Sequence, residues 1–195
     1  MSSPTPTSPT PSQAHVLVSA DFTDRVRGVT DWDAATPVPE WTARDVVRHL
    51  TDWLPGLLAA GSDLRLPQAP SVDEDPVARW LAHTEAVQGL LDDPEAAATV
   101  VKNPAFGEPA LAAMLEQFYV PDVFMHTWDL ARASGQPDRL DAGFAATLLT
   151  GMESIEPMLR ASGQFGTRQA IREGADATDR LMAFVGRDPY WRRSS

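Results

Sequence analysis

Apolar residues recur at helical spacing along most of this sequence, and no useful stretch shows the two-residue alternation of a half-buried β-strand. The best-marked stripe runs through Val46, Leu50, Trp53 or Leu54, and Leu57. The same spacing predicts helices over residues 13–29, 42–61, 76–91, 109–135, 141–161 and 177–185. Four long helices joined by long connections indicate an all-α protein, a bundle with at least one unusual crossover connection.

Local signals mark several of these helix ends. Thr42 is a good N-cap residue, and Asp45 three positions later completes a variant of the capping box. Gly61 is a plausible end for the same helix, which Pro55 can bend. Pro121 predicts a kink in the helix over residues 109–135.

The N-terminal sequence "MSSPTPTSPTPSQ" is rich in Pro, Ser and Thr, which cannot build a core. We therefore expect a disordered tail over residues 1–12, a single domain over residues 13–191 and a short tail over residues 192–195. The first residues lack the charged and apolar regions of a signal peptide. No apolar run approaches the ~20 residues that span a bilayer. We therefore expect a soluble cytoplasmic protein.

Charge and composition exclude several classes of function. The formal net charge of −11 disfavours nucleic acids and anionic membranes as partners, since both attract basic surfaces. The sequence has no Cys, so disulfides, thiolate nucleophiles and Cys-ligated zinc are excluded, and any thiol must arrive with a substrate. Lys102 is the single lysine among 16 basic residues, a bias typical of a GC-rich bacterial genome.

Three titratable residues recur at helical spacing in "YVPDVFMHTWDLARASG", residues 119–135. Asp122 and His126 are four residues apart, so both side chains can reach one cation from the same helix face. His49, on or beside the apolar stripe of another helix, is the candidate third ligand. Two imidazoles and a carboxylate with open positions suit Zn²⁺, Ni²⁺ or Fe²⁺ better than Ca²⁺ or Mg²⁺. Alternatively, Asp122 caps a helix after a kink, and both histidines are satisfied core residues.

Asp129 follows His126 by three residues and has two interpretations. It can orient an imidazole from outside the ligand set, or it can form a surface ion pair with Arg132.

Other residues have a functional and a structural interpretation. Trp41 and Trp128 flank the candidate ligands and either wall a pocket or pack in the core. Arg187, in the ending "GRDPYW", is a weak candidate for gripping an anionic substrate. His83 is more simply explained as a structural histidine, and His15, beside the N-terminal tail, is not expected to be a ligand.

Three blocks, "TPVPEWTARDVVRHL", "VFMHTWDLARASGQP" and "ATDRLMAFVGRDPYW", resemble the DinB/YfiT-like metalloenzymes. More closely, they resemble a branch related to the metal-binding domain of mycothiol-dependent maleylpyruvate isomerase. The resemblance covers roughly residues 13–191. It implies a DinB-like four-helix bundle with additional short helices, and a divalent ion bound by His49, Asp122 and His126. Zn²⁺ is the favoured metal. Glu is common at the position of Asp122 in the isomerase branch.

The resemblance also implies a function. The metal would present a low-molecular-weight thiol, such as mycothiol, for attack on a small electrophile, which makes the protein a thiol transferase or an isomerase. The expected partners are that thiol and that electrophile, with a homodimer as the candidate assembly. The isomerase carries a second, C-terminal domain for which this chain has no room, so maleylpyruvate isomerisation itself is not expected. Two alternatives stay open: a metal-dependent hydrolase that uses bound hydroxide, and a non-catalytic metal- or ligand-binding bundle.

Overall fold

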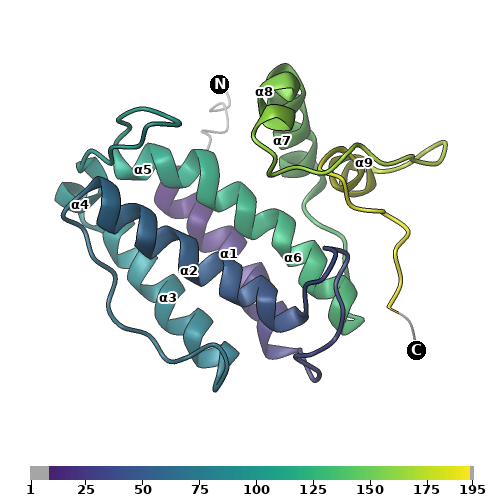
Figure 1. Cartoon of the computed structure of the whole chain (residues 1–195), viewed down its shortest axis with the longest axis horizontal. Helices are drawn as coiled ribbons and strands as arrows, with labels where there is room; N and C mark the ends of the chain where they lie inside the picture. The colour runs from purple at the N-terminus through teal and green to yellow at the C-terminus, as the bar shows by residue number, and fades with distance from the viewer. Residues whose placement is uncertain (1–8, 194–195) are drawn as a thin grey trace, which may run out of the picture. The chain divides into compact units, whose positions relative to one another are not determined.

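The computed structural model describes residues 9–193, and helices are the regular structure throughout that range. Their order along the chain is α1 (Pro11–Arg27), α2 (Ala43–Gly61), α3 (Pro76–Asp92), α4 (Pro94–Ala98), α5 (Leu111–Met114), the π-helical segment η1 (Leu115–Tyr119), α6 (Val120–Ser134), α7 (Ala142–Ser154), α8 (Glu156–Ala161) and α9 (Ala177–Phe184) (Figure 1). Within the described range, β-type backbone pairing is limited to isolated bridges, such as the one between Ala35 and Thr42. The predicted all-α class is confirmed. None of these helices is both long and apolar enough to cross a membrane.

The ends of the domain differ in detail from the prediction. Helix α1 begins at Pro11, two residues before the predicted start, because Pro is suited to the first turn and Ser12 donates a hydrogen bond to Asp92. The predicted disordered tail otherwise falls largely outside the described residues, as does the end of the predicted tail over residues 192–195. The single domain expected over residues 13–191 stays a prediction.

The described chain divides into two compact units. The first contains residues 9–24 and 47–123, and the second contains residues 25–46 and 124–193. Helices α1, α2 and α6 each contribute residues to both units.

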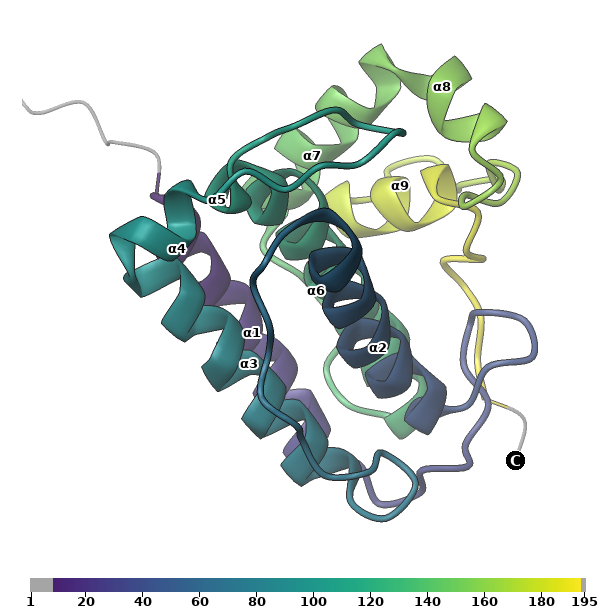
Figure 2. The ribbon, with the colours of Figure 1, turned by 60° about the vertical axis from the view of Figure 1, so that its left-hand side comes forward.

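Helices α1 and α3 run side by side in the first unit (Figure 2). The rings of Phe22 and Trp80 pack edge to face with their centroids 4.5 Å apart, and the Trp80 indole N–H donates to Thr23 Oγ1 at 2.8 Å. Nearer the start of α1, His15 contacts Gln88 at 2.7 Å. The partner numbers fall along α3 as they rise along α1, so the two helices are antiparallel.

The predicted bounds of α2 agree closely with the structure. The Thr42 N–H donates to Asp45 Oδ2 at 2.9 Å, and the Asp45 N–H donates to Thr42 Oγ1 at 3.3 Å, which is the reciprocal pattern of a capping box. The helix continues through Pro55. It ends at Gly61, whose carbonyl accepts from the Lys102 N–H; a Cβ at Gly61 would lie 2.4 Å from the Lys102 carbonyl oxygen.

The helix predicted over residues 109–135 is interrupted, but before Pro121. It consists of α5, the π-helical segment η1 and α6, and Pro121 lies in the first turn of α6. Because proline has no N–H, it cannot bond the carbonyl four residues back, and the preceding turn widens instead.

The prediction of one helix over residues 141–161 is wrong. The structure has α7 and α8, separated at Ile155. Pro157 in the first turn of α8 has no N–H for the Glu153 carbonyl, so a continuous helix loses a hydrogen bond there. Helix α7 packs against α9, which the Asp176 side chain caps.

A short helix also occurs outside the predicted helical ranges. Helix α4 begins after Asp93, whose carboxylate accepts from the N–H groups of Glu95 and Ala96. Three alanines after this cap favour a helical turn.

Candidate metal centre

His49 and Asp122 meet in the first unit, although 73 residues separate them in the sequence. His49 Nε2 lies 3.1 Å from Asp122 Oδ2. The two side chains keep 33% and 20% of their surface exposed, so the pair is accessible to a small solute. A nitrogen and an oxygen donor at this separation can share one cation.

Trp53 holds the same carboxylate. Its indole N–H donates to Asp122 Oδ2 at 3.0 Å, from a position one helical turn after His49 on α2. Its ring also contacts Tyr119, at 5.7 Å between centroids. In the sequence, Trp53 belongs only to an apolar stripe. The signal for its second role is that a half-buried indole needs a hydrogen-bond acceptor.

His126 follows Asp122 by one turn of the continuous helix α6. It is 4% exposed, and in the second unit its Nδ1 lies 2.9 Å from Asp129 Oδ2. An ionised carboxylate can only accept a hydrogen bond, so a neutral His126 carries its proton on Nδ1 and its lone pair on Nε2. That tautomer is the one in which Nε2 can bind a metal ion.

Asp129 is completely buried, yet it is ionised at neutral pH. Burial alone raises the pKa of a carboxyl group, but the Arg187 guanidinium and the hydrogen bond from His126 outweigh it and hold the pKa of Asp129 below its ordinary value. Arg187 Nη2 lies 3.1 Å from Asp129 Oδ2. Of the two interpretations of Asp129, these contacts favour the imidazole partner. Arg132 pairs with Asp138 at 2.8 Å instead.

The other residues that the sequence singled out differ in whether they contact a candidate ligand. Trp41 stacks on the His126 ring, with centroids 5.6 Å apart and planes 18° apart. Trp128 is buried, with the Arg132 guanidinium 4.9 Å from its ring centroid, and so packs as a core residue. Arg187 contacts a carboxylate of its own chain, so the weak substrate-gripping interpretation loses its support. His15 and His83 lie buried in the first unit, and the burial of His83 agrees with its structural interpretation.

The sequence profile of the mycothiol maleylpyruvate isomerase N-terminal domain family matches residues 17–131. This range holds the candidate ligands and Asp129. The chain belongs to this family. The family is one of DinB-like metal-binding domains, which confirms the predicted resemblance and the predicted DinB-like helical bundle.

Two relatives come from Mycobacterium tuberculosis: uncharacterized protein MT0763 of strain CDC 1551 / Oshkosh and uncharacterized protein Rv0738 of strain ATCC 25618 / H37Rv. Each is 28% identical to this chain over 155 residues, which is 78% of this chain and 82% of the relative. No solved structure matches the chain.

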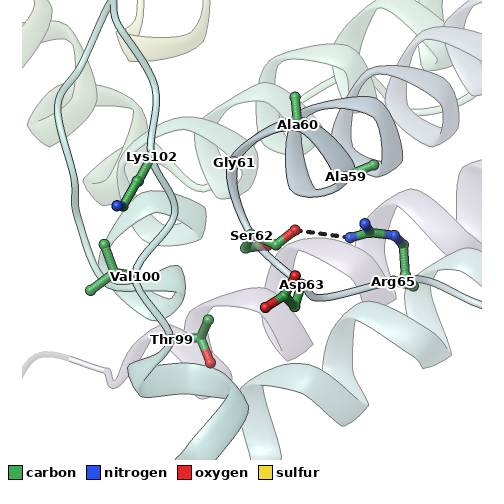
Figure 3. A pocket seen from close by; sticks show the side chains of 9 residues that line it. All are labelled: Ala59, Ala60, Gly61, Ser62, Asp63, Arg65, Thr99, Val100 and Lys102. Carbon is green, nitrogen blue, oxygen red and sulfur yellow. Dashed lines mark hydrogen bonds between the residues drawn. The ribbon is translucent and has the colours of Figure 1, made fainter.

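A separate open cavity of about 470 Å³ lies at the C-terminal end of α2 (Figure 3). Arg65 and Lys102 line it, but Arg65 donates to the Ser62 carbonyl at 2.9 Å, the contact drawn in the figure. The carbonyl end of a helix repels anions, which disfavours an anion site at these two cations. None of the candidate metal ligands lines this cavity.

Proposed function

We propose that this chain binds a divalent metal ion through His49, Asp122 and His126 and activates a small thiol, such as mycothiol, for attack on a small electrophile. The contact between His49 and Asp122 is the observation that carries the proposal, because it joins two potential ligands from distant helices. His126 follows Asp122 by four residues on α6, and His49, Asp122 and His126 are side chains that together could hold an ion. Membership in a metal-binding family supports the same assignment.

The chemistry of the donors fits such an ion. Two neutral imidazole nitrogens and one carboxylate oxygen are typical ligands of Zn²⁺, Ni²⁺ or Fe²⁺, and Zn²⁺ is the favoured candidate. Such a ligand set carries a single negative charge, so a bound dication keeps a net positive charge. When bound, the ion would supply the positive charge that lowers the pKa of an incoming thiol.

The residues around the ligands hold them in place. Trp53 fixes one oxygen of Asp122 through its N–H, and Asp129 fixes the tautomer of His126. Trp41 stacks on the His126 ring and restricts its rotation. The partial exposure of His49 and Asp122 admits a small cosubstrate.

The thiol belongs to the cosubstrate, since the sequence contains no Cys. The thiol loses its proton, its sulfur adds to the carbon of an activated double bond, and the proton returns to the other carbon of the opened π bond, which makes a thioether. If the thioether is the product, the protein is a transferase. If the thiol leaves again after the substrate has rearranged, the protein is an isomerase. A bacterial cytoplasmic location and a homodimeric state stay predictions.

The test combines metal analysis with thiol binding. We expect about one divalent ion per chain in freshly purified protein. In the Co²⁺-substituted form, mycothiol should produce a sulfur-to-cobalt charge-transfer band. Asp122→Asn should weaken metal binding, whereas the control Asp52→Asn should not, because Asp52 pairs with Arg79 on the outer side of α2.

Three results would count against this function. Wild-type protein that cannot be loaded with metal would exclude the metal centre. Metal binding without a thiol band would favour a non-catalytic binding protein. Thiol-independent turnover of an ester or amide would favour the hydrolase.

A further inference from the structure

Three buried ring side chains gather in the first unit: His15 of α1, His83 of α3 and Tyr119 of η1. They are 0%, 4% and 0% exposed. The Tyr119 ring centroid lies 5.9 Å from that of His15 and 5.9 Å from that of His83. Two imidazoles and a phenol thus share one small region of an otherwise apolar core.

Each ring buries a polar atom that has no hydrogen-bond partner among the described residues. These atoms are His15 Nε2, His83 Nε2 and Tyr119 Oη. A buried polar atom without a partner is strongly unfavourable, and native structures contain few of them. His15 and His83 both pack against the Tyr119 ring, so these three atoms indicate a shared partner that is not part of the chain.

The protonation of His15 follows from its neighbours. The Gln88 side-chain N–H₂ group donates to Asp92 Oδ1 and Ser12 Oγ, both at 2.8 Å. Its oxygen therefore faces His15 Nδ1, at 2.7 Å, and must accept the proton from that nitrogen. His15 Nε2 is left with a lone pair and needs a donor.

We infer that one water molecule binds between His15, His83 and Tyr119. It donates one proton to each imidazole Nε2 and accepts the proton of the Tyr119 hydroxyl. Three hydrogen bonds are the usual number for a buried water, and this arrangement satisfies all three partnerless atoms.

The uncharged state of the three side chains favours a neutral ligand, such as water, over a cation. Burial lowers the pKa of His83 to about 3, with smaller contributions in the same direction from Arg79 and His15. Burial also lowers the pKa of His15, and burial together with the charge of Asp122 raises the pKa of the Tyr119 hydroxyl well above its ordinary value. At neutral pH all three side chains are uncharged. A divalent ion bound by them alone would be buried without any neutralising charge, which is strongly unfavourable.

The water site is distinct from the candidate metal centre, but Tyr119 of the water site contacts Trp53, which bonds a candidate metal ligand. Trp53 packs its ring on Tyr119 and directs its N–H at Asp122. The bound water therefore helps to fix the surface on which Trp53 rests.

A high-resolution crystal structure of the full-length wild-type protein tests this inference directly. We expect one oxygen-sized peak at about 2.7–3.2 Å from His15 Nε2, His83 Nε2 and Tyr119 Oη. Diffraction data at the Zn, Ni and Fe absorption edges should show no anomalous signal at that peak. An empty space between the rings, a direct ring-to-ring hydrogen bond, or an anomalous signal there would overturn the inference.

Oxygen-17 relaxation dispersion, which counts long-lived internal waters, tests it in solution. Tyr119→Phe removes the hydroxyl and should lower the count by about one. The matched control is Tyr190→Phe, because the Tyr190 hydroxyl accepts from the Arg172 N–H outside this cluster. An unchanged count in Tyr119→Phe, or an equal loss in both variants, would overturn the inference. If Tyr119→Phe does not fold, the wild-type crystal structure decides.

Discussion

Arg187 and Asp129 form an ion pair across 58 residues of the sequence, with Arg187 Nη2 3.1 Å from Asp129 Oδ2. The same carboxylate oxygen contacts His126 Nδ1 at 2.9 Å. The segment after α9 is therefore linked, through one buried carboxylate, to a candidate metal ligand. This link connects the C-terminal sequence block "GRDPYW" with the block that contains His126.

Arg187→Met should destabilise the protein by roughly 3–5 kcal/mol, because it leaves the buried Asp129 without its cationic partner. It should also weaken metal binding, since a carboxylate without Arg187 holds the His126 tautomer less firmly. Urea unfolding and metal titration would measure the two effects. Arg180→Met is the control, because Arg180 is exposed and its side chain bonds only the Ala175 carbonyl among the described contacts. Equal stability of the two variants would contradict this role for Arg187.

His126→Ala should remove most of the bound metal and leave the helical content largely intact. The core of the protein is apolar and does not need the metal to fold, unlike a small zinc finger. Metal content and circular dichroism of the variant beside wild type would check this. Loss of helix together with metal would show that the ion has a folding role.

Substitutions of the two acids should form a graded series. Asp129→Asn should lower metal affinity by about 10–100-fold, because it touches a ligand and not the ion. Asp122→Asn should fall between Asp129→Asn and His126→Ala, since an amide oxygen still coordinates but carries no charge. Competition with a metal chelator would rank the three variants. Equal metal retention in all three would leave a helical bundle with satisfied core histidines.

Local chemistry explains which parts of the fold were predictable. The Thr42–Asp45 pair specifies the start of α2 through contacts within three residues, so the sequence alone predicts it. Gly61 was predictable only as a helix-ending residue type, since its contact is with the distant Lys102. The break at Ile155 was missed because the apolar spacing continues through it, while the missing N–H of Pro157 acts only on the backbone. The π-helical segment before Pro121 likewise changes the hydrogen bonding without changing the apolar pattern.

The candidate site was predictable in part. The spacing of Asp122 and His126 follows from helical geometry, and His49 follows from its place beside the apolar stripe of α2, which the resemblance supports. Trp53 and Arg187 were missed as partners of the carboxylates because their contacts join residues 69 and 58 positions apart. Such pairs depend on tertiary packing, which no local pattern specifies.

Trp53→Phe should weaken metal binding while preserving the fold. The variant keeps an aromatic ring against Tyr119 but removes the N–H that holds Asp122. A hydrogen bond to a charged group contributes about 1.5–3 kcal/mol, so metal affinity should fall by roughly 10-fold or more. The control is Trp80→Phe, which removes an indole N–H bonded to Thr23 in the same unit and should lower stability but not metal affinity. If both variants bound metal equally well, Trp53 would have only a packing role.

Acid should destabilise the protein partly through His83. The pKa of His83 is lowered from 6.5 to about 3 in the folded state, chiefly by burial. Between these two values the unfolded chain binds a proton that the folded chain does not, so stability is full above pH 6.5 and falls as the pH drops toward 3. At pH 4.5 the loss from this residue should be roughly 2–3 kcal/mol relative to pH 7.5.

His83→Gln removes the titrating group, so the unfolding free energy of this variant should fall less over this range. Urea unfolding of both proteins at the two pH values measures the difference, which also cancels the titration of the other groups. Parallel losses in wild type and His83→Gln would mean that His83 is protonated, and therefore hydrated, in the native state.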